Sequence, residues 1–310
     1  MKGKIVVLGA GHVGSHVARA LAGGQIGSEI VLVDLLPEKA AAQAMDIADA
    51  FTYPFVPVTV RTGDYGDCAD ADVIVSAIGK PREPGQTRLD LLGDSVRMIH
   101  VLARDLRKAG LGGPVISITN PCDIAADCLR KELNLDRSRV FGTGTLLDTA
   151  RLIRTLSEQT GCPRNKINAC VMGEHGDSSI IPFSAVRIAG KAPRDVAGFN
   201  AEDALRRTHE IGMDIINGKG STEFGIGQAT AFLVQNILTD SKAVLPLSPL
   251  LKGEYGLTGI HCGVPCMIGR QGIVQIIELP ITEEEQQALN RSASVIEKHI
   301  RLADEIRASL

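Results

Sequence analysis

The stretch Lys4-Ile5-Val6-Val7-Leu8-Gly9-Ala10-Gly11-His12-Val13-Gly14 decides the fold of this chain. Its first five residues are mostly apolar and β-branched, which predicts a buried strand. Three glycines follow in the spacing G-x-G-x-x-G. Gly9 permits a tight turn, Gly11 lets the backbone approach a pyrophosphate, and Gly14 lets a helix pack closely on the strand.

A helix, a second strand and an acidic residue complete this pattern. Residues 15–22 suit a helix whose N-terminus would offer unpaired N–H groups to phosphates. Residues 29–33 form another apolar run that ends at Asp34. A carboxylate there would accept hydrogen bonds from an adenosine ribose and repel a 2′-phosphate, which favours NAD over NADP. We expect His12 and Val13, inside the turn, to neighbour the cofactor through their backbone without a catalytic role.

The composition narrows the class of protein. The 310 residues suffice for two domains or one large one, with a sizeable core. A net charge of −3 offers no basic field for nucleic acid, and no apolar run approaches the ~20 residues that cross a membrane. Seven cysteines, an odd number in mostly apolar contexts, indicate free thiols in a reducing cytoplasm. No signal peptide is visible, so we expect a cytoplasmic protein.

Strand-like and helix-like segments alternate through the first half of the chain. Buried runs such as residues 72–77 favour a parallel sheet with helices on both faces. After residue 143 the regular alternation ends, and the sequence predicts helices mixed with short strands. We therefore expect an α/β fold with a doubly wound Rossmann sheet in an NAD-binding domain (residues 1–143), followed by a second domain of mixed α/β structure (residues 144–310). The expected strands are 56–62, 73–77, 115–119, 140–142, 167–172, 184–188, 266–269 and 272–277. The expected helices are 39–50, 95–108, 124–132, 148–160, 201–217 and 228–238.

The C-terminal segment predicts one more helix. Thr282 and Glu285 have the spacing of a capping box, and apolar residues then recur at helical spacing. This apolar stripe is structural, serving either core packing or a subunit contact. Its members are Leu289, Ala293, Ile296, Ile300 and Ala303.

Two further segments carry candidate chemistry. Residues 79–90, GKPREPGQTRLD, follow an expected strand of the sheet and contain Arg82 and Arg88. Such a loop suits a lid that closes over an anion, although a solvated charged loop explains it equally well. The stretch Gly173-Glu174-His175-Gly176-Asp177-Ser178 places a histidine between flexible residues after an apolar run. His175 can exchange a proton near neutral pH, although a lone histidine is more often a structural residue.

Taken together, these segments resemble the L-lactate/L-malate dehydrogenase family. The resemblance runs in matching order along essentially the whole chain, and the combination of motifs is specific. It implies a Rossmann domain for NAD, a mixed α/β substrate domain and a homodimer or homotetramer. The segments that carry it are Gly9–Gly14, Asp34, Pro81–Arg88, Thr119-Asn120-Pro121, Leu147-Asp148-Thr149-Ala150-Arg151 and Gly173–Ser178.

The resemblance also implies catalytic roles. His175 matches the family's proton donor, and Asp148 matches the carboxylate that orients it. Arg88 matches the residue that polarises the reacting carbonyl. The carboxylate of the substrate would be held by Arg151, three residues after Asp148 on the same helix face, whereas without the family the two would be read as an ordinary surface ion pair. Asn120 matches a residue at the nicotinamide end of the cofactor, within reach of the substrate.

The identity of the small 2-hydroxy acid rests on conflicting signals. Six residues before Arg88, lactate enzymes of the family commonly have glutamine and malate enzymes arginine, and this chain has Arg82. A buried cation there would pair with the second carboxylate of malate, which favours malate and oxaloacetate. Residues 173–179 and Thr222, a pocket residue frequent in the lactate branch, favour lactate and pyruvate instead. We favour malate and oxaloacetate, because Arg82 has a direct charge argument, and L-lactate dehydrogenase is the alternative.

Other classes of protein remain as alternatives. A non-catalytic NAD-binding sensor would have the same fold, but it would be expected to lose some of His175, Asp148, Arg151 and Arg88. An NAD-dependent glycosidase would need a divalent metal held by cysteine and histidine, and we expect no metal site. Cys262 and Cys266 beside His261 lack a second ligand pair for zinc, so buried thiols are the expected explanation.

Overall fold

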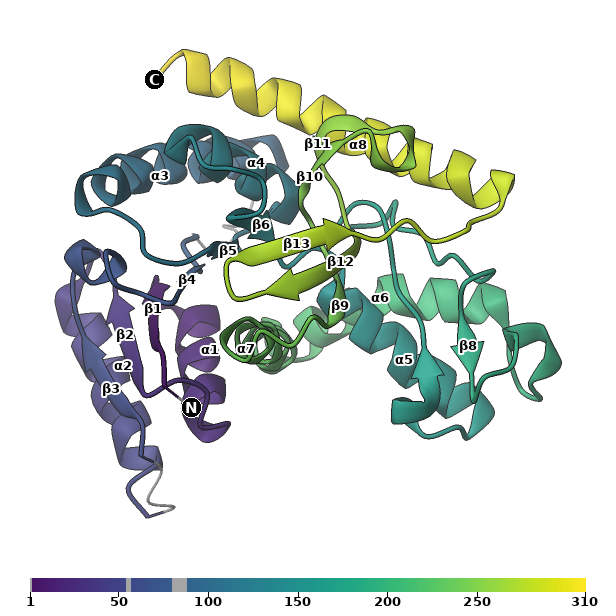
Figure 1. Ribbon diagram of the computed structural model, residues 1–310, viewed down its shortest axis with the longest axis horizontal. Helices are drawn as coiled ribbons and strands as arrows, with labels where there is room; N and C mark the ends of the chain where they lie inside the picture. Colours follow the sequence, from purple (N-terminus) through teal and green to yellow (C-terminus); the bar gives the residue numbers. More distant parts are fainter. Residues whose placement is uncertain (1, 54–56, 80–87) are drawn as a thin grey trace.

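The computed structural model describes residues 2–53, 57–79 and 88–310. Their first half forms a six-stranded parallel sheet with helices packed against it, as predicted (Figure 1). The strands are β1 (Lys4–Leu8), β2 (Glu29–Val33), β3 (Thr59–Thr62), β4 (Val73–Ser76), β5 (Val115–Ser117) and β6 (Val140–Gly142). Their order is β3-β2-β1-β4-β5-β6, so the chain reverses direction across the sheet between β1 and β4. Ligands bind at this switch point, beyond the carboxyl ends of the strands, in open α/β sheets.

Among the described residues, four α-helices and one short 3-10 helix, Tyr65–Cys68, lie between these strands in the chain. The α-helices are α1 (His12–Gly23), α2 (Pro37–Ala50), α3 (Arg88–Ala109) and α4 (Cys122–Leu133). Each begins at or before the position that apolar periodicity predicts. Helix α2, for example, starts two residues early because Pro37 at its first turn is already in a helical conformation.

The second half is built from helices and small antiparallel sheets. Its helices are α5 (Leu146–Thr160), α6 (Ala201–Lys219), α7 (Phe224–Leu238) and α8 (Glu283–Ala308). Its strands are β7 (Ile167–Asn168), β8 (Arg187–Ile188), β9 (Val244–Leu247), β10 (Leu250–Lys252), β11 (Thr258–His261), β12 (Val264–Gly269) and β13 (Gly272–Ile276). They pair as β7 with β8, β10 with β11, and β13-β12-β9.

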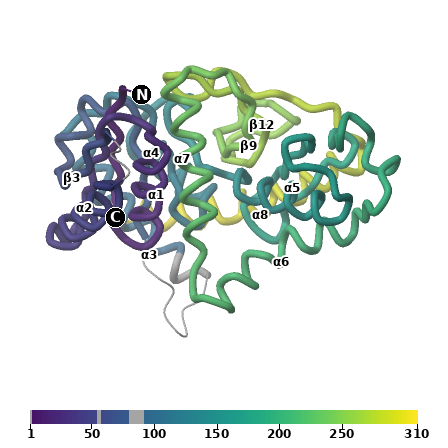
Figure 2. The backbone as a smooth tube through the Cα atoms, turned by 90° about the horizontal axis from the view of Figure 1, so that it is seen from below, coloured from purple at the N-terminus to yellow at the C-terminus, as the bar shows by residue number. Residues whose placement is uncertain are grey.

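Two helices join the halves of the molecule. Helix α7 lies between α1 and α5 (Figures 1 and 2). A Cβ atom at Gly227 of α7 would lie 3.0 Å from the carbonyl oxygen of His16 in α1, so a small residue is needed where these helices meet. Helix α8 extends across the top of the molecule in Figure 1 and packs against α3, α4 and β11. Its capping box is present, and all five residues of the predicted apolar stripe are buried in the core of this chain.

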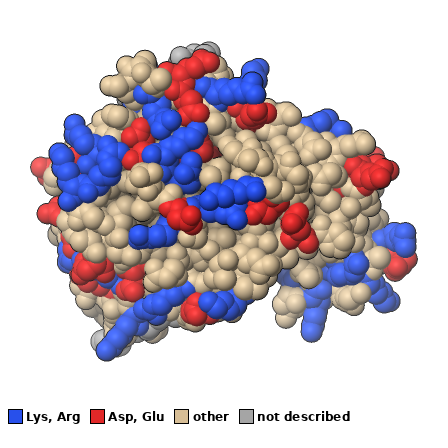
Figure 3. Space-filling view, turned by 45° about the horizontal axis from the view of Figure 1, so that its top comes forward, with Lys and Arg blue, Asp and Glu red and all other residues tan. Residues whose placement is uncertain are grey.

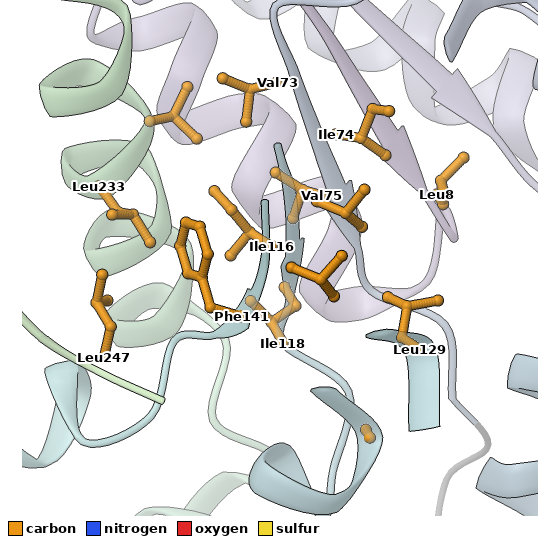
Figure 4. Packing of buried hydrophobic residues seen from close by; sticks show 14 of the residues in the cluster. Leu8, Val73, Ile74, Val75, Ile116, Ile118, Leu129, Phe141, Leu233 and Leu247 are labelled. Carbon is orange, nitrogen blue, oxygen red and sulfur yellow. The ribbon is translucent and has the colours of Figure 1, made fainter. Parts of the chain in front are cut away.

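The core continues from the sheet into the second half. Val73, Val75 and Ile116 from the sheet lie near Phe141 of β6 and Leu233 of α7 (Figure 4). Burial on both faces explains why these strands are continuous apolar runs. A second cluster packs α5 against β7 and β8, and it includes Leu152, Leu156 and Ile188.

The expected strands of the second half are partly wrong. The segment expected as strand 167–172 is a strand only at Ile167–Asn168, because Met172 and Gly173 instead make isolated bridges to Ile180 and Gly263. The expected strand 184–188 shrinks to Arg187–Ile188. Strands β9, β10 and β11 were not expected, since prolines and glycines interrupt their apolar pattern. Pro246, for instance, lies in β9 at the edge of its sheet, where proline is tolerated.

The surface carries charges of both signs. On the face shown in Figure 3, lysines and arginines lie beside aspartates and glutamates. Exposed ion pairs such as Arg301 with Glu297 on α8 contribute to this mixture. In the described part of the chain, the helices are too short or too polar to cross a membrane.

Candidate active site

The glycine turn forms a tight cradle at the end of β1. Gly9 has φ of +96°, and a Cβ atom on Gly14 would lie 1.8 Å from the carbonyl oxygen of Gly9. Neither position therefore accepts a side chain without moving backbone. A Cβ on Gly11 would meet only the Nζ atom of Lys39, at 3.9 Å, so the outer side of the turn is open. This open backbone at the start of α1 suits a pyrophosphate, and the cation of Lys39, which sequence reasoning had missed, lies on the same side.

The carboxylate of Asp34 is hydrogen-bonded to the glycine turn. Its Oδ2 atom accepts the N–H of Ala10 at 2.7 Å, and Oδ1 accepts the N–H of Leu36 at 3.0 Å. Each carboxylate oxygen has a further lone pair with which to accept a ribose hydroxyl. His12 is exposed at the start of α1 and Val13 is half-buried against the core. Their contacts with the cofactor stay predictions.

The predicted catalytic residues of the second half come together around one carboxylate. Asp148, on the first turn of α5, is 7% exposed. Its Oδ2 atom lies 2.7 Å from Nδ1 of His175, and its Oδ1 atom accepts a hydrogen bond from Nη1 of Arg151 at 2.9 Å. Without the family, Asp148 and Arg151 would be read as an ordinary surface ion pair. In the structure Asp148 is buried, Arg151 is only partly exposed, and the pair is linked to the histidine.

This carboxylate controls the protonation of the histidine. The negative charge of Asp148 raises the pKa of His175 from 6.5 to about 9, and the hydrogen bond between them adds to this effect. Burial alone would raise the pKa of Asp148, but His175 and Arg151 more than offset it, so the net pKa is lowered. His175 is thus an imidazolium at neutral pH in this structure, with its Nε2 atom available to exchange a proton.

Backbone contacts from three other segments hold the histidine loop. Gly173 exchanges two backbone hydrogen bonds with Gly263, and the N–H of Glu174 donates to Oγ of Ser292 in α8 at 2.8 Å. The N–H of His175 donates to Oδ2 of Asp123 at 2.9 Å. Sequence reasoning missed Asp123 and Ser292. The only visible signal was the acidic residue two positions after Pro121 in the Thr119-Asn120-Pro121 motif.

The other residues predicted to contact the substrate lie in three different segments of the chain. Asn120 is exposed in the connection between β5 and α4, and its carbonyl accepts a hydrogen bond from the hydroxyl of Ser95 at 3.0 Å. Thr222 lies in the connection between α6 and α7, where Gly225 approaches Leu147 next to Asp148. Helix α3 begins at Arg88, whereas Arg82 and most of the proposed lid lie outside the described residues. Substrate contacts of all four residues stay predictions.

The cysteines beside His261 are buried, as predicted. Burial raises the pKa of both Cys262 and Cys266, which keeps them as neutral thiols. His261 instead faces Asp127, with 3.2 Å between Nδ1 and Oδ1. Within the described ranges, no cluster of three or more histidine, cysteine or acidic side chains is arranged to hold a metal ion.

A Rossmann sheet with an open glycine turn, together with a partly exposed histidine bonded to a buried aspartate, defines the class of nicotinamide-dependent dehydrogenases. Comparison with known families agrees with this class. The model for the lactate/malate dehydrogenase NAD-binding domain matches residues 3–142, and that for the alpha/beta C-terminal domain of the same family matches residues 145–306. The chain belongs to the lactate/malate dehydrogenase family, and its cofactor is NAD.

Individual relatives extend over nearly the whole chain. An L-lactate dehydrogenase of Priestia megaterium is 37% identical over 95% of both chains. One of Lactobacillus helveticus is 35% identical, covering 95% of this chain and 93% of its own. Among solved structures, a lactate dehydrogenase from a deep-sea metagenome library superposes with a TM-score of 0.94 at 30% identity, covering 98% and 99% of the two chains. A malate dehydrogenase of Picrophilus torridus gives the same TM-score at 28% identity, covering 100% and 99%.

Proposed function

We propose that this enzyme interconverts a small L-2-hydroxy acid and its 2-oxo acid, with lactate and pyruvate as the first candidates. The carboxylate of Asp148 carries the proposal, because it bonds both a proton donor, His175, and a cation suited to a substrate carboxylate, Arg151. The bond to Asp148 uses one of the five N–H donors of Arg151, so its planar fork keeps donors for a bidentate grip.

The chemistry divides between cofactor and protein. NAD, when bound, supplies the acceptor or donor of the hydride. For reduction of the 2-oxo acid, His175 gives the proton on Nε2 to the oxygen at C2. In the reverse direction the neutral ring accepts the proton from the hydroxyl. Asp148 holds the ring through Nδ1 in both directions and stabilises the imidazolium. Arg88 would polarise the carbonyl and Asn120 would contact the nicotinamide end, as the family implies.

The choice of lactate follows from the relatives. The relatives of Priestia megaterium and Lactobacillus helveticus are named L-lactate dehydrogenases, and each matches 95% of this chain. Malate remains the second candidate because of Arg82, whose charge would match a second carboxylate, and a malate dehydrogenase is among the similar structures. The similar proteins therefore support lactate as the substrate better than malate, the substrate that Arg82 favours.

Steady-state kinetics with NADH separate these candidates. We expect measurable kcat/KM with pyruvate and oxaloacetate, and 2-oxoisocaproate tests for a pocket that admits longer side chains. A preference for oxaloacetate over pyruvate would show that malate, and not lactate, is the preferred hydroxy acid. Absence of turnover with all three acids, in a protein that still binds NADH, would favour the NAD-binding sensor over an enzyme.

The variant Arg82→Gln tests the specificity argument directly. We expect the ratio of kcat/KM for oxaloacetate to that for pyruvate to fall about 10- to 100-fold, because the second carboxylate loses a charged partner. Lys80→Gln removes a charge from the same loop and serves as the matched control. An unchanged ratio in Arg82→Gln would place Arg82 outside the substrate pocket.

We also propose the domain boundary, the cellular compartment and the oligomeric state of the enzyme. We place the boundary between an NAD-binding and a substrate domain at residues 143 and 144, where the parallel sheet ends with β6. All seven cysteines are unpaired, which favours a reducing cytoplasm. A homodimer or homotetramer is proposed from the family resemblance, and light scattering would distinguish the two.

A further inference from the structure

A second buried carboxylate contacts the histidine loop. Asp123 is 1% exposed on the first turn of α4. Its Oδ2 atom accepts the backbone N–H of His175 at 2.9 Å, and its Oδ1 atom accepts the hydroxyl of Ser248 at 2.6 Å. Both oxygens are thus bonded, and one of the bonds ends on the proton donor itself.

One partner of Asp123, Ser248, is bonded to the last strand of the parallel sheet. Ser248 is fully buried and exchanges two backbone hydrogen bonds of 3.0 Å with Gly142, the last residue of β6. Helix α4 follows β5 through Asn120 and Pro121, so Asp123 lies beyond the carboxyl ends of the parallel strands. The N-terminal end of a helix also favours a negative side chain. The carboxylate therefore reaches from the nucleotide half of the molecule to the proton donor.

The charged groups around His175 come from three elements. Asp148 and Arg151 face it from α5, Asp123 from α4, and Glu174 belongs to its own loop, as does Asp177. Asp148 raises the pKa of His175 most, Asp123 raises it further, and Arg151 lowers it. The pKa of Asp123 is raised, because burial outweighs the bonds from Ser248 and from the N–H of His175, which favour its ionised form.

We propose that Asp123 is a positioning residue for proton transfer, which fixes the backbone of His175 through its N–H and adds a second carboxylate to the surroundings of the proton donor. Asp148 orients the imidazole through Nδ1, and Asp123 sets where the loop holds that imidazole. This inference deepens the proposed function of the same site and rests on it.

The neighbouring carboxylate on the same helix provides a matched comparison. Asp127 lies one turn beyond Asp123 and is equally buried. Its contacts are Lys131, at 2.7 Å, and His261, at 3.2 Å. Replacing Asp127 removes a buried charge from α4 without removing a bond to His175. A general loss of stability would therefore affect both variants, and a positioning effect only one.

The test is an NMR titration of histidine-labelled full-length protein with NAD bound. The signal of His175 is assigned by its absence in His175→Gln. Asp123→Asn keeps an oxygen for the N–H of His175 but removes the charge, so we expect the pKa of His175 to fall by about one pH unit. Asp127→Asn should leave it within about 0.3 of the wild-type value, because its partners are Lys131 and His261. The pH profile of kcat/KM for hydroxy-acid oxidation should shift in the same direction as the titration, with an unchanged Kd for NADH.

Each outcome decides the proposal. An unchanged His175 pKa in Asp123→Asn, or equal shifts in both variants, would overturn it. Should Asp123→Asn not fold, Ser248→Ala removes one donor to the carboxylate and should lower the pKa of His175 by a smaller amount, whereas no change would count against the proposal. The titration does not require turnover, so an inactive wild type would contradict the proposed function and leave the positioning role of Asp123 to be decided by NMR.

Discussion

The glycine turn and the histidine loop are both sites of function, but they are built in opposite ways. The turn is local, since Gly9 and Gly14 are five residues apart and shape one another's space. The histidine loop depends on residues far away in the sequence. Its hydrogen-bond partners Asp148, Asp123 and Ser292 are separated from it by 27, 52 and 118 positions in the chain. A short motif therefore suffices to recognise the cofactor site, whereas the acid–base site exists only after folding.

Removal of the proton donor is the strongest test of the assembled site. His175→Ala should lower kcat about 10²- to 10⁴-fold, because it removes the imidazole that Asp148 holds for proton exchange, while NADH still binds the separate turn. Turnover and NADH fluorescence titration measure the two effects. Retained turnover would show that His175 is not the proton donor.

The matching test of the local site compares two glycines. Gly14→Ala forces a Cβ into the carbonyl of Gly9, so both the Tm and NADH affinity should fall, the latter about 100-fold. Gly11→Ala meets open space, so it should weaken NADH binding by obstructing the pyrophosphate while the Tm stays near that of the wild type. If both substitutions lowered the Tm equally, the space around Gly14 would not be tighter than that around Gly11, and the description of the turn would be wrong.

The pH dependence sharpens the description of the assembled site. Because the pKa of His175 is raised to about 9, the neutral base needed for hydroxy-acid oxidation is scarce below that pH. Its kcat/KM should rise about tenfold per pH unit up to about 9, and that of 2-oxo-acid reduction should be flat and then fall above it. The raised pKa also stabilises the fold fully below pH 6.5, and this contribution is lost as pH rises through about 9. A profile centred near 6.5 would show that Asp148 does not stabilise the imidazolium.

A smaller effect is expected at the contact with α8. Ser292→Ala leaves the N–H of Glu174 without its acceptor, and we expect kcat to fall about tenfold or less. Ser294→Ala, on the exposed side of the same helix, should have no effect on kcat. Equal kcat in both variants would mean that α8 does not help to position the histidine loop.

Most of the first half could be predicted from the sequence. Strands such as β4 and β6 are fully buried, so their continuous apolar runs stand out between helical patterns. The second half was harder. Gly173 has φ of +96° and pairs with Gly263, far along the chain, so the apolar run before it does not continue as a strand. No local period encodes such a pairing.

The candidate site shows the same division. His175, Asp148 and Arg151 were identified by their resemblance to the family, and the structure brings them together. Asp123 was missed because a single aspartate at the start of a helix is also an ordinary helix-stabilising residue. Only its burial and its bond to the histidine backbone distinguish it.

The sequence by itself determined the glycine turn, the acidic residue after the second strand and the alternation that specifies a parallel sheet. These features depend on backbone conformation and on side-chain burial within a few residues. The tertiary structure alone decided which carboxylates surround His175 and with what effect on its pKa. Electrostatic interactions in a buried site depend on distances of a few ångströms between residues that lie far apart in the chain.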